Sequence, residues 1–171
     1  MLVCAAIGVS IFFTYSMHST DQQAEIIPGV TSTKRVVLLG NSITEEWERI
    51  RPSFFQSHQI NQATVQFTNR GVSGETTRQM KFRMDRDVFA EHPDVFVLLG
   101  GINDIAENEG YVPDSVIISN MEDIVLRAKE LHAQVILCSI LPAKAFPWRT
   151  NISPAERIVA VNQALQQVAE R

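Results

Sequence analysis

Short apolar runs alternate with longer helix-like segments through most of this chain, and this alternation restricts its possible folds more than any other feature. Continuous apolar runs at residues 36–39, 95–99 and 135–141 are typical of strands covered on both faces, while residues 63–68 alternate as a more exposed strand does. Strands separated by helices of this length form βαβ units and a mainly parallel sheet. The chain is therefore predicted to be an α/β protein, a three-layer α/β/α sandwich.

Helix-like segments connect the predicted strands. Residues 44–55 are helical in pattern but interrupted by Pro52, residues 76–90 form a polar helix, and residues 114–132 carry a clean apolar stripe. Residues 153–156, Ser-Pro-Ala-Glu, predict a capping box with proline at the first position of a last helix. The second segment and the last helix are predicted to bury Met80, Met84, Val88, Ile158, Val161, Leu165 and Val168.

The N-terminal region differs in composition from the rest. Residues 1–16 are mostly apolar and uncharged, and residues 17–33 form a polar linker. The fourteen uncharged, mostly apolar residues 2–15 would span about 21 Å as a helix, against roughly 30 Å of bilayer hydrocarbon, so the segment suits a signal peptide better than a membrane span. Export to the periplasm or the outside is therefore expected, by an atypical signal without a basic start. The alternative is a buried N-terminal helix in a cytoplasmic protein.

Length and composition exclude several classes of protein. With 171 residues, 45% hydrophobic and 20% charged, the chain is long enough for one domain and is typical neither of disordered nor of polytopic membrane proteins. A net charge of −4 and the lack of a basic cluster argue against nucleic acid as a partner. Cys4 and Cys138 cannot form a disulfide framework and have no ligand neighbours at metal-binding spacing. No metal site and no cofactor is predicted.

Three loops that follow predicted strands carry the residues suited to chemistry. Ser42 lies in Gly-Asn-Ser-Ile-Thr, Gly74 in Asn-Arg-Gly-Val-Ser-Gly-Glu-Thr, and Asn103 in Gly-Gly-Ile-Asn-Asp. Loops at the same ends of parallel strands converge on one crevice. A hydroxyl, a backbone N–H beside glycine and a side-chain amide can attack an acyl carbon and hold the resulting oxyanion. Each residue also has a structural explanation, as an N-cap serine, a turn glycine and an Asx-type loop residue.

These three segments resemble the first three sequence blocks of the SGNH hydrolases, also called GDSL-like lipases and esterases. The resemblance covers residues 34–171 and implies a flavodoxin-like domain that hydrolyses esters through a serine acyl-enzyme. It assigns Ser42 as the nucleophile, and Gly74 and Asn103, together with the N–H of Ser42, as the oxyanion hole.

Four further residues are predicted to line the substrate pocket: Asn41, Trp47, Trp148 and Arg149. Asn41 replaces the aspartate that is common in the first block, which keeps an acceptor oxygen but removes the charge. With Trp47 after it, this form is most similar to a branch of lysophospholipase-like and carbohydrate O-acetyl esterases. Trp148 and Arg149 could supply an aromatic wall and a cation, and the alternative is a loop held by packed aromatic rings.

The sequence lacks the motif that supplies the general base in this family. The last block of the family is Asp-x-x-His after a further strand, and this sequence contains no such motif. Histidines 18, 58, 92 and 132 are expected at the opposite end of the sheet or outside it, beyond the reach of proton transfer from Ser42. The resemblance thus implies a domain without its C-terminal strand and base, with one free sheet edge, as a fragment or as a pseudoenzyme.

The predicted function is hydrolysis of small acyl or acetyl esters, such as carbohydrate O-acetyl or lysophospholipid-like substrates, with weak or no activity in the chain as it stands. The alternative is a non-catalytic binding module that keeps the crevice for an ester or an acetylated carbohydrate. A flavodoxin-like cofactor protein is disfavoured because it would leave the second and third loops unexplained. The predicted partner is a small-molecule ester.

Overall fold

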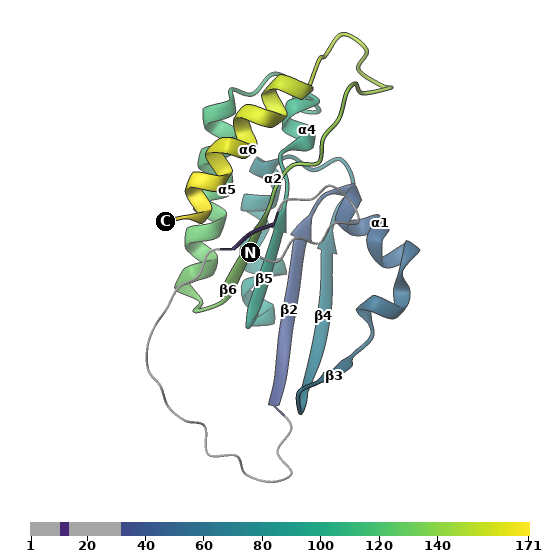
Figure 1. The fold of residues 1–171 in the computed structure, drawn as a ribbon, viewed down its shortest axis with the longest axis vertical. Coiled ribbons are helices and arrows are strands. Elements are labelled where there is room, and N and C mark those ends of the chain that lie inside the picture. The colour runs from purple at the N-terminus through teal and green to yellow at the C-terminus, as the bar shows by residue number, and fades with distance from the viewer. Residues whose placement is uncertain (1–10, 14–31) are drawn as a thin grey trace.

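The computed structural model of the protein describes residues 11–13 and 32–171, which contain a six-stranded sheet (Figure 1). The strand order is β1-β6-β5-β2-β4-β3, and the four inner strands run parallel to one another. The two short edge strands, β1 and β3, are antiparallel to their neighbours. The strands are β1 (Ile11–Phe13), β2 (Ser32–Gly40), β3 (His58–Ile60), β4 (Ala63–Gly71), β5 (Val95–Leu99) and β6 (Gln134–Cys138). The predicted α/β class with a mainly parallel sheet is confirmed.

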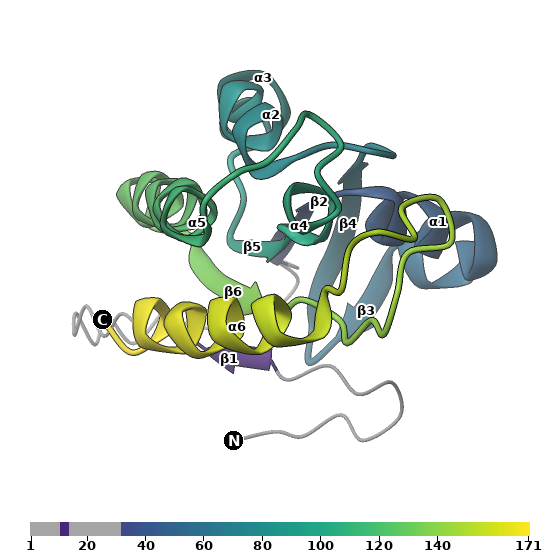
Figure 2. The ribbon, with the colours of Figure 1, turned by 90° about the horizontal axis from the view of Figure 1, so that it is seen from above.

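Helices join the parallel strands. Figure 2 shows α2, α3 and α5 together on one side of the sheet and α1 on the other, while α6 runs beside β6 and β1. The α-helices are α1 (Ser42–Ile50), α2 (Thr77–Phe82), α3 (Met84–Asp87), α4 (Ile102–Ile105), α5 (Asp114–Glu130) and α6 (Ala155–Ala169). Two 3₁₀ turns, Pro52–Phe55 and Phe89–Glu91, follow α1 and α3.

The core lies between the sheet and the helices that follow β4, β5 and β6. Alternate residues of the central strands point into it, among them Val37 and Leu39 of β2 and Phe96 and Leu98 of β5. The predicted helix faces meet them, because their apolar residues recur at three- and four-residue spacing. The residues predicted to form these faces that are buried are Met80, Met84, Val88, Ile117, Met121, Ile124, Ala128, Ile158, Val161, Leu165 and Val168.

Two predictions about helices are wrong. Residues 76–90 do not form one helix, because the chain leaves helical geometry at Arg83 (φ −97°, ψ 5°) and continues as α3 and a 3₁₀ turn. In a straight α-helix, residues four positions apart point in slightly different directions, so Met80, Met84 and Val88 would turn progressively away from one another. Broken into three short pieces, the segment buries all three side chains in the core. The capping box at residues 153–156 is also absent, since Pro154 is the N-cap of α6 and no side chain caps it.

The sheet edge next to β6 is not free. Residues Ile11–Phe13 pair antiparallel with Ile136 to Cys138 and occupy the edge that was expected to be open. The rest of the predicted signal peptide, and most of the predicted linker, lie outside the described residues. The linker is shorter than predicted at its C-terminal end, because β2 already begins at Ser32.

No helix in residues 11–13 and 32–171 is both long and apolar enough to cross a bilayer. In the same ranges, no group of three or more His, Cys, Asp or Glu side chains is placed to hold a metal ion. Cys138 is a buried free thiol, and burial raises its pKa to about 11.

Candidate active site

Ser42 is the first residue of α1 and follows directly on the end of β2. Asn41 caps the helix, because its side-chain oxygen accepts a hydrogen bond of 3.0 Å from the N–H of Ile43. The first N–H groups of a helix have no partner within it, and with the helix dipole they favour negative charge. Within residues 32–171, neither the N–H nor the hydroxyl of Ser42 makes a hydrogen bond. Both groups of this half-buried residue are therefore available to a ligand.

Gly74 lies in the loop after β4, in a conformation that suits glycine. Its φ of +80° is left-handed, and no atom lies within 4 Å of the position that a Cβ would occupy. The carbonyl of Gly74 accepts a hydrogen bond of 3.2 Å from the side-chain amide of Asn108. The Gly74 loop is thus anchored by Asn108, which follows the third loop in the chain, while the side of Gly74 where a Cβ would lie is not covered.

Asn103 comes from the loop after β5 and is almost completely buried, with 5% of its surface exposed. Its Nδ2 donates a hydrogen bond of 2.9 Å to the carbonyl of Glu75, the residue after Gly74. A primary amide has two N–H groups, so one remains for another acceptor. The neighbouring Asp104 accepts bonds of 2.9 Å and 2.7 Å from the N–H and the hydroxyl of Thr77. Burial raises the pKa of Asp104 above its ordinary value, and the bonds from Thr77 oppose this effect.

The first and second loops are also bonded to each other. The N–H of Val72 donates to the carbonyl of Gly40 at 3.0 Å, and the amide of Asn69 donates to the carbonyl of Thr44 at 2.7 Å. A Cβ on Gly71 would collide with the backbone nitrogen of Glu45, so the two loops approach closely. Together with the contact of Asn103, these bonds bring the three predicted loops to one end of the sheet. The catalytic roles of Ser42, Gly74 and Asn103 stay predictions.

Two of the predicted pocket residues belong to the first loop and α1. Asn41 is 1% exposed, and its side-chain oxygen faces the helix that it caps; its role in a substrate pocket stays a prediction. Trp47 is partly exposed, with its ring stacked on Phe54 at 4.7 Å between centroids. Trp47 also lines a mostly apolar cavity of about 200 Å³, whose other lining residues are Leu38, Leu39, Ile43, Thr44, Val97, Leu99, Cys138 and Leu141.

Trp148 and Arg149 lie in the loop after β6. Trp148 is 62% exposed, and its ring lies 5.4 Å from that of the buried Phe146, as in a loop held by packed rings. Arg149 donates a hydrogen bond of 3.3 Å to the carbonyl of Glu107, four residues after Asn103. The 146–149 loop therefore borders the third loop of the site.

The histidines that the structure describes lie away from Ser42. His58 pairs with Val65 near the amino end of β4, and His92 and His132 lie shortly before the first residues of β5 and β6, Val95 and Gln134. All three are thus at the end of the sheet opposite to the loops of the site, as predicted. His18 lies outside the described residues. Within the described ranges, no histidine is placed to take a proton from Ser42.

A buried charged cluster beside the site was missed by the sequence analysis. Arg83 has only 6% of its side chain exposed and forms ion pairs with Glu75 and Asp87. The signal was present in the sequence, because Arg83 lies next to Met84, three residues after Met80, on the helix face predicted to be buried. A charged residue on an apolar face indicates a buried partner.

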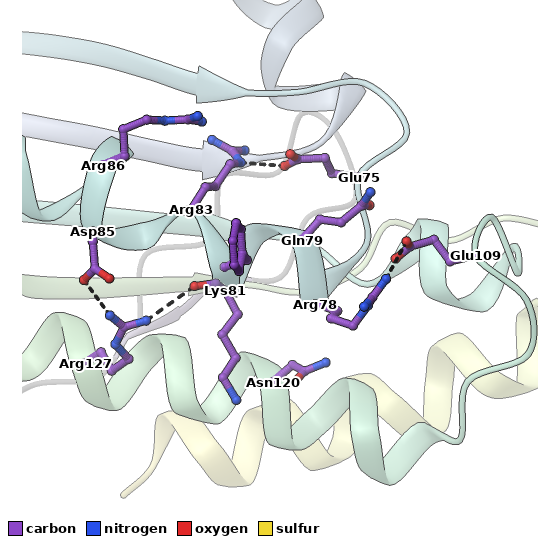
Figure 3. A pocket seen from close by; sticks show the side chains of 11 residues that line it. Glu75, Arg78, Gln79, Lys81, Arg83, Asp85, Arg86, Glu109, Asn120 and Arg127 are labelled. Carbon is purple, nitrogen blue, oxygen red and sulfur yellow. Dashed lines mark hydrogen bonds and ion pairs between the residues drawn. The ribbon is translucent and has the colours of Figure 1, made fainter.

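Figure 3 shows the groove that continues outward from this cluster along α2 and α5, with a volume of about 800 Å³. Two of its arginines are paired with acids, Arg78 with Glu109 at 2.8 Å and Arg127 with Asp85 at 2.7 Å. Phe82 extends from α2 at the same groove with 91% of its surface exposed.

Comparison with known proteins agrees with this geometry. An acetylxylan esterase from Geobacillus stearothermophilus is 31% identical over 116 residues, which cover 62% of this chain and 50% of that protein. The crystal structure of a GDSL-like lipase from Bacteroides thetaiotaomicron superposes with a TM-score of 0.72 at 36% identity, over 80% of this chain and 63% of that one. A lipase/acylhydrolase from Enterococcus faecalis shares the fold, with a TM-score of 0.59 at 24% identity, over 79% of this chain and 70% of that one.

This chain therefore spans half the length of the curated relative and less than two thirds of the Bacteroides structure. The family model of the GDSL-like lipases and acylhydrolases matches residues 38–171, which include all three loops of the site, the end of β2 and the whole of β4, β5 and β6. The chain belongs to the GDSL-like lipase/acylhydrolase family.

Proposed function

We propose that the crevice at the carboxyl ends of β2, β4 and β5 is the nucleophile and oxyanion part of a serine ester hydrolase. The observation that carries this proposal is the convergence of three bonded loops on the N-terminus of α1, where Ser42 has an unpartnered N–H and hydroxyl. The expected reaction is hydrolysis of small acyl or acetyl esters through an acyl-enzyme.

The residues of the crevice divide the chemistry between them. The Oγ of Ser42 attacks the ester carbonyl carbon, its proton passes to a general base, and the carbonyl oxygen becomes an oxyanion. The N–H groups of Ser42 and Gly74 and the second amide N–H of Asn103 donate to that oxygen. The tetrahedral intermediate collapses as the alcohol leaves with the proton, and water then hydrolyses the acyl-serine by the same route.

The base is the one component that residues 32–171 do not supply. Without a base, a serine hydroxyl is a weak nucleophile, although oxyanion donors still lower the barrier. In a serine protease, loss of the serine or the histidine lowers turnover by about 10⁶, and the remaining site still accelerates the reaction by roughly 10³ to 10⁴ over water. Activity of the chain alone is therefore expected to be low.

The test compares ester hydrolysis and covalent labelling in two proteins. The chain alone, and the chain extended by a strand and an Asp-x-x-His segment, are assayed with 4-nitrophenyl acetate and a fluorophosphonate probe. The extended protein is expected to label at Ser42 at least about 10³-fold faster, and Ser42→Ala should abolish labelling in both. Rapid labelling of the chain alone would show that it holds a base of its own. No labelling in either protein would contradict the proposal.

The substrate that we propose is an acetyl ester on a carbohydrate. One observation supports it: the curated relative is an acetylxylan esterase. The extended protein is offered acetylated xylo-oligosaccharides and lysophospholipids in parallel, with release of acetate or fatty acid measured. Preferred release of fatty acid would overturn the choice of substrate without affecting the ester-hydrolase proposal.

A second candidate function is a non-catalytic binding module, favoured by the absence of a described histidine at the site. A binder would hold an acetylated oligosaccharide with the same affinity in the wild type and in Ser42→Ala. It would also stay unreactive after the segment is added. Calorimetric titration together with acetate release distinguishes it from the enzyme.

A further inference from the structure

Arg83 lies outside the three loops of the site and yet contacts the ends of two strands that lead into them. Its guanidinium makes four contacts inside the protein, shown in part in Figure 3. Two are ion pairs, from Nε to Glu75 at 2.6 Å and from Nη1 to Asp87 at 2.5 Å. The other two are hydrogen bonds from Nη2 to the carbonyls of Gly40 (3.3 Å) and Arg70 (2.7 Å).

The two carbonyls mark the points where the catalytic loops begin. Gly40 is the last residue of β2, two positions before Ser42, and its carbonyl also accepts the N–H of Val72. Arg70 is the second-last residue of β4, four positions before Gly74. One planar group thus holds the ends of two adjacent strands at a set separation, and with them the loops that carry the nucleophile and an oxyanion donor.

The ion pair with Glu75 extends this arrangement to the third loop. Glu75 follows Gly74, its carboxylate binds Arg83, and its backbone carbonyl accepts the amide of Asn103. A shift of Glu75 would therefore move both the Gly74 loop and the Asn103 amide. Arg83 is in this way connected to all three proposed oxyanion donors: to Ser42 through Gly40, and to Gly74 and Asn103 through Glu75.

Only arginine can make these contacts from this position. The guanidinium offers five N–H donors in a rigid plane, so it can bind two carboxylates and two carbonyls at once, whereas a lysine ammonium has three donors at one point. Burial of this charge is tolerated because two carboxylates, Glu75 and Asp87, compensate it.

We propose that Arg83 is a positioning residue of the ester-hydrolase site, which sets the Gly74 loop and the Asn103 amide relative to Ser42. The proposal rests on the proposed function, because positioning matters only where the three groups act together. In this proposal Arg83 does not touch the substrate and acts only through the loops that it holds.

The first experiment does not depend on activity. Hydrogen exchange of the backbone amides is measured by NMR in the wild type, Arg83→Lys and Arg86→Lys. Arg86 is the matched control, because it lies three residues further on, in α3, binds the same Asp87, has a side chain that is 75% exposed and makes no hydrogen bond or ion pair with the loops in the described part of the chain. Arg83→Lys is expected to speed exchange of the Val72 amide at least tenfold while amides of α5 keep their rates, and Arg86→Lys should change neither.

The second experiment measures catalysis in the protein extended by the Asp-x-x-His segment. Arg83→Lys is expected to lower kcat about 100-fold with KM changed less than about twofold, because displaced donors weaken transition-state binding more than substrate binding. Arg86→Lys should keep the wild-type kcat. If the wild type is inert in the extended form, the proposed function fails, whereas the exchange measurement still tests the contacts of Arg83.

Two results would overturn the proposal. One is wild-type exchange at Val72 together with wild-type kcat in Arg83→Lys. The other is equal acceleration of exchange in the loops and in α5, which would mean that Arg83 only stabilises the fold. If Arg83→Lys does not fold, Glu75→Gln is used instead, since it keeps an acceptor for Nε but removes the charge. Wild-type kcat and exchange in Glu75→Gln would then contradict the proposal.

Discussion

At the scale of single residues, the polar groups under the site are almost all satisfied, and Asn41 is an exception. Its oxygen caps α1, but its Nδ2 is buried without a hydrogen-bond partner in the described part of the chain. An unpaired buried donor costs free energy comparable to a lost hydrogen bond. The first loop therefore combines a stabilising cap with a destabilising amide on the same side chain.

Substitution of Asn41 separates these two effects. Serine caps a helix as well as asparagine does and has no amide, so Asn41→Ser is expected to be at least as stable as the wild type. Alanine cannot cap, so Asn41→Ala should be about 1 kcal/mol less stable than Asn41→Ser. Urea unfolding of the three proteins measures the difference. A wild type more stable than both variants would show that the Asn41 amide has an acceptor.

Asp87 makes the stability of the protein depend on pH. Its hydrogen bond with Arg86, and next its bond with Arg83, lower the pKa of Asp87 from 3.8 to about 2. Because the folded pKa is lower than the unfolded one, the carboxylate contributes stability above about pH 4, on the order of 2 kcal/mol, and this is lost as the pH falls to about 2. Asp87→Asn should therefore flatten the pH dependence of urea unfolding between pH 4 and 2. Parallel curves for the two proteins would argue against this assignment.

At the scale of secondary structure elements, the site depends on how closely β4 approaches the start of α1. Gly71 ends β4, pairs with Gly40 across the sheet and leaves no space for a side chain against the backbone of Glu45. The break between α2 and α3 belongs to the same scale, because it places Arg83 under the ends of β2 and β4. Short elements and glycine thus determine the spacing of the loops.

A methyl group at Gly71 should therefore disturb the packing of α1. Gly71→Ala is expected to lower the free energy of unfolding by about 3 kcal/mol, because the added carbon meets backbone atoms that cannot rotate away. Gly110→Ala is the control: its φ of +91° is strained for alanine but its Cβ position is open, so a loss of about 1 kcal/mol is expected. Equal losses measured by urea unfolding would show that β4 and α1 can separate at low cost.

At the scale of the whole molecule, the two edges of the sheet are covered by short antiparallel strands. β3 is joined to its partner β4 by a turn, whereas β1 lies near the N-terminus and pairs with the distant β6. An unpaired edge offers N–H and C=O groups to other chains and promotes aggregation. The N-terminal strand is thus expected to protect β6.

Removal of the N-terminal residues tests this role. A protein that begins at Ser32 should give less soluble material than the full chain and should elute partly as oligomers in size-exclusion chromatography, because the outer edge of β6 is then unpaired. Equal yield and a single monomer peak for both proteins would show that β1 does not protect the sheet.

The sequence alone determined the features that depend on neighbouring residues. The apolar runs of β2 and β5 identify buried strands because strand burial follows a local pattern. Ser42, Gly74 and Asn103 are predicted as site residues because each lies in a loop that follows a predicted strand. The stripes of α5 and α6 were equally visible, since helical periodicity is also local. Similarity between short motifs then sufficed to indicate the family.

Tertiary structure decided what depends on residues far apart in the chain. The guanidinium of Arg83 meets a carbonyl 43 positions away, so no local pattern could reveal this contact. Asn41 faces inward because packing around the start of α1 buries it, although its polarity favours a pocket wall. The pairing of β1 with β6 joins residues more than a hundred positions apart. Long-range contacts of this kind are set by the whole fold, and local propensity does not encode them.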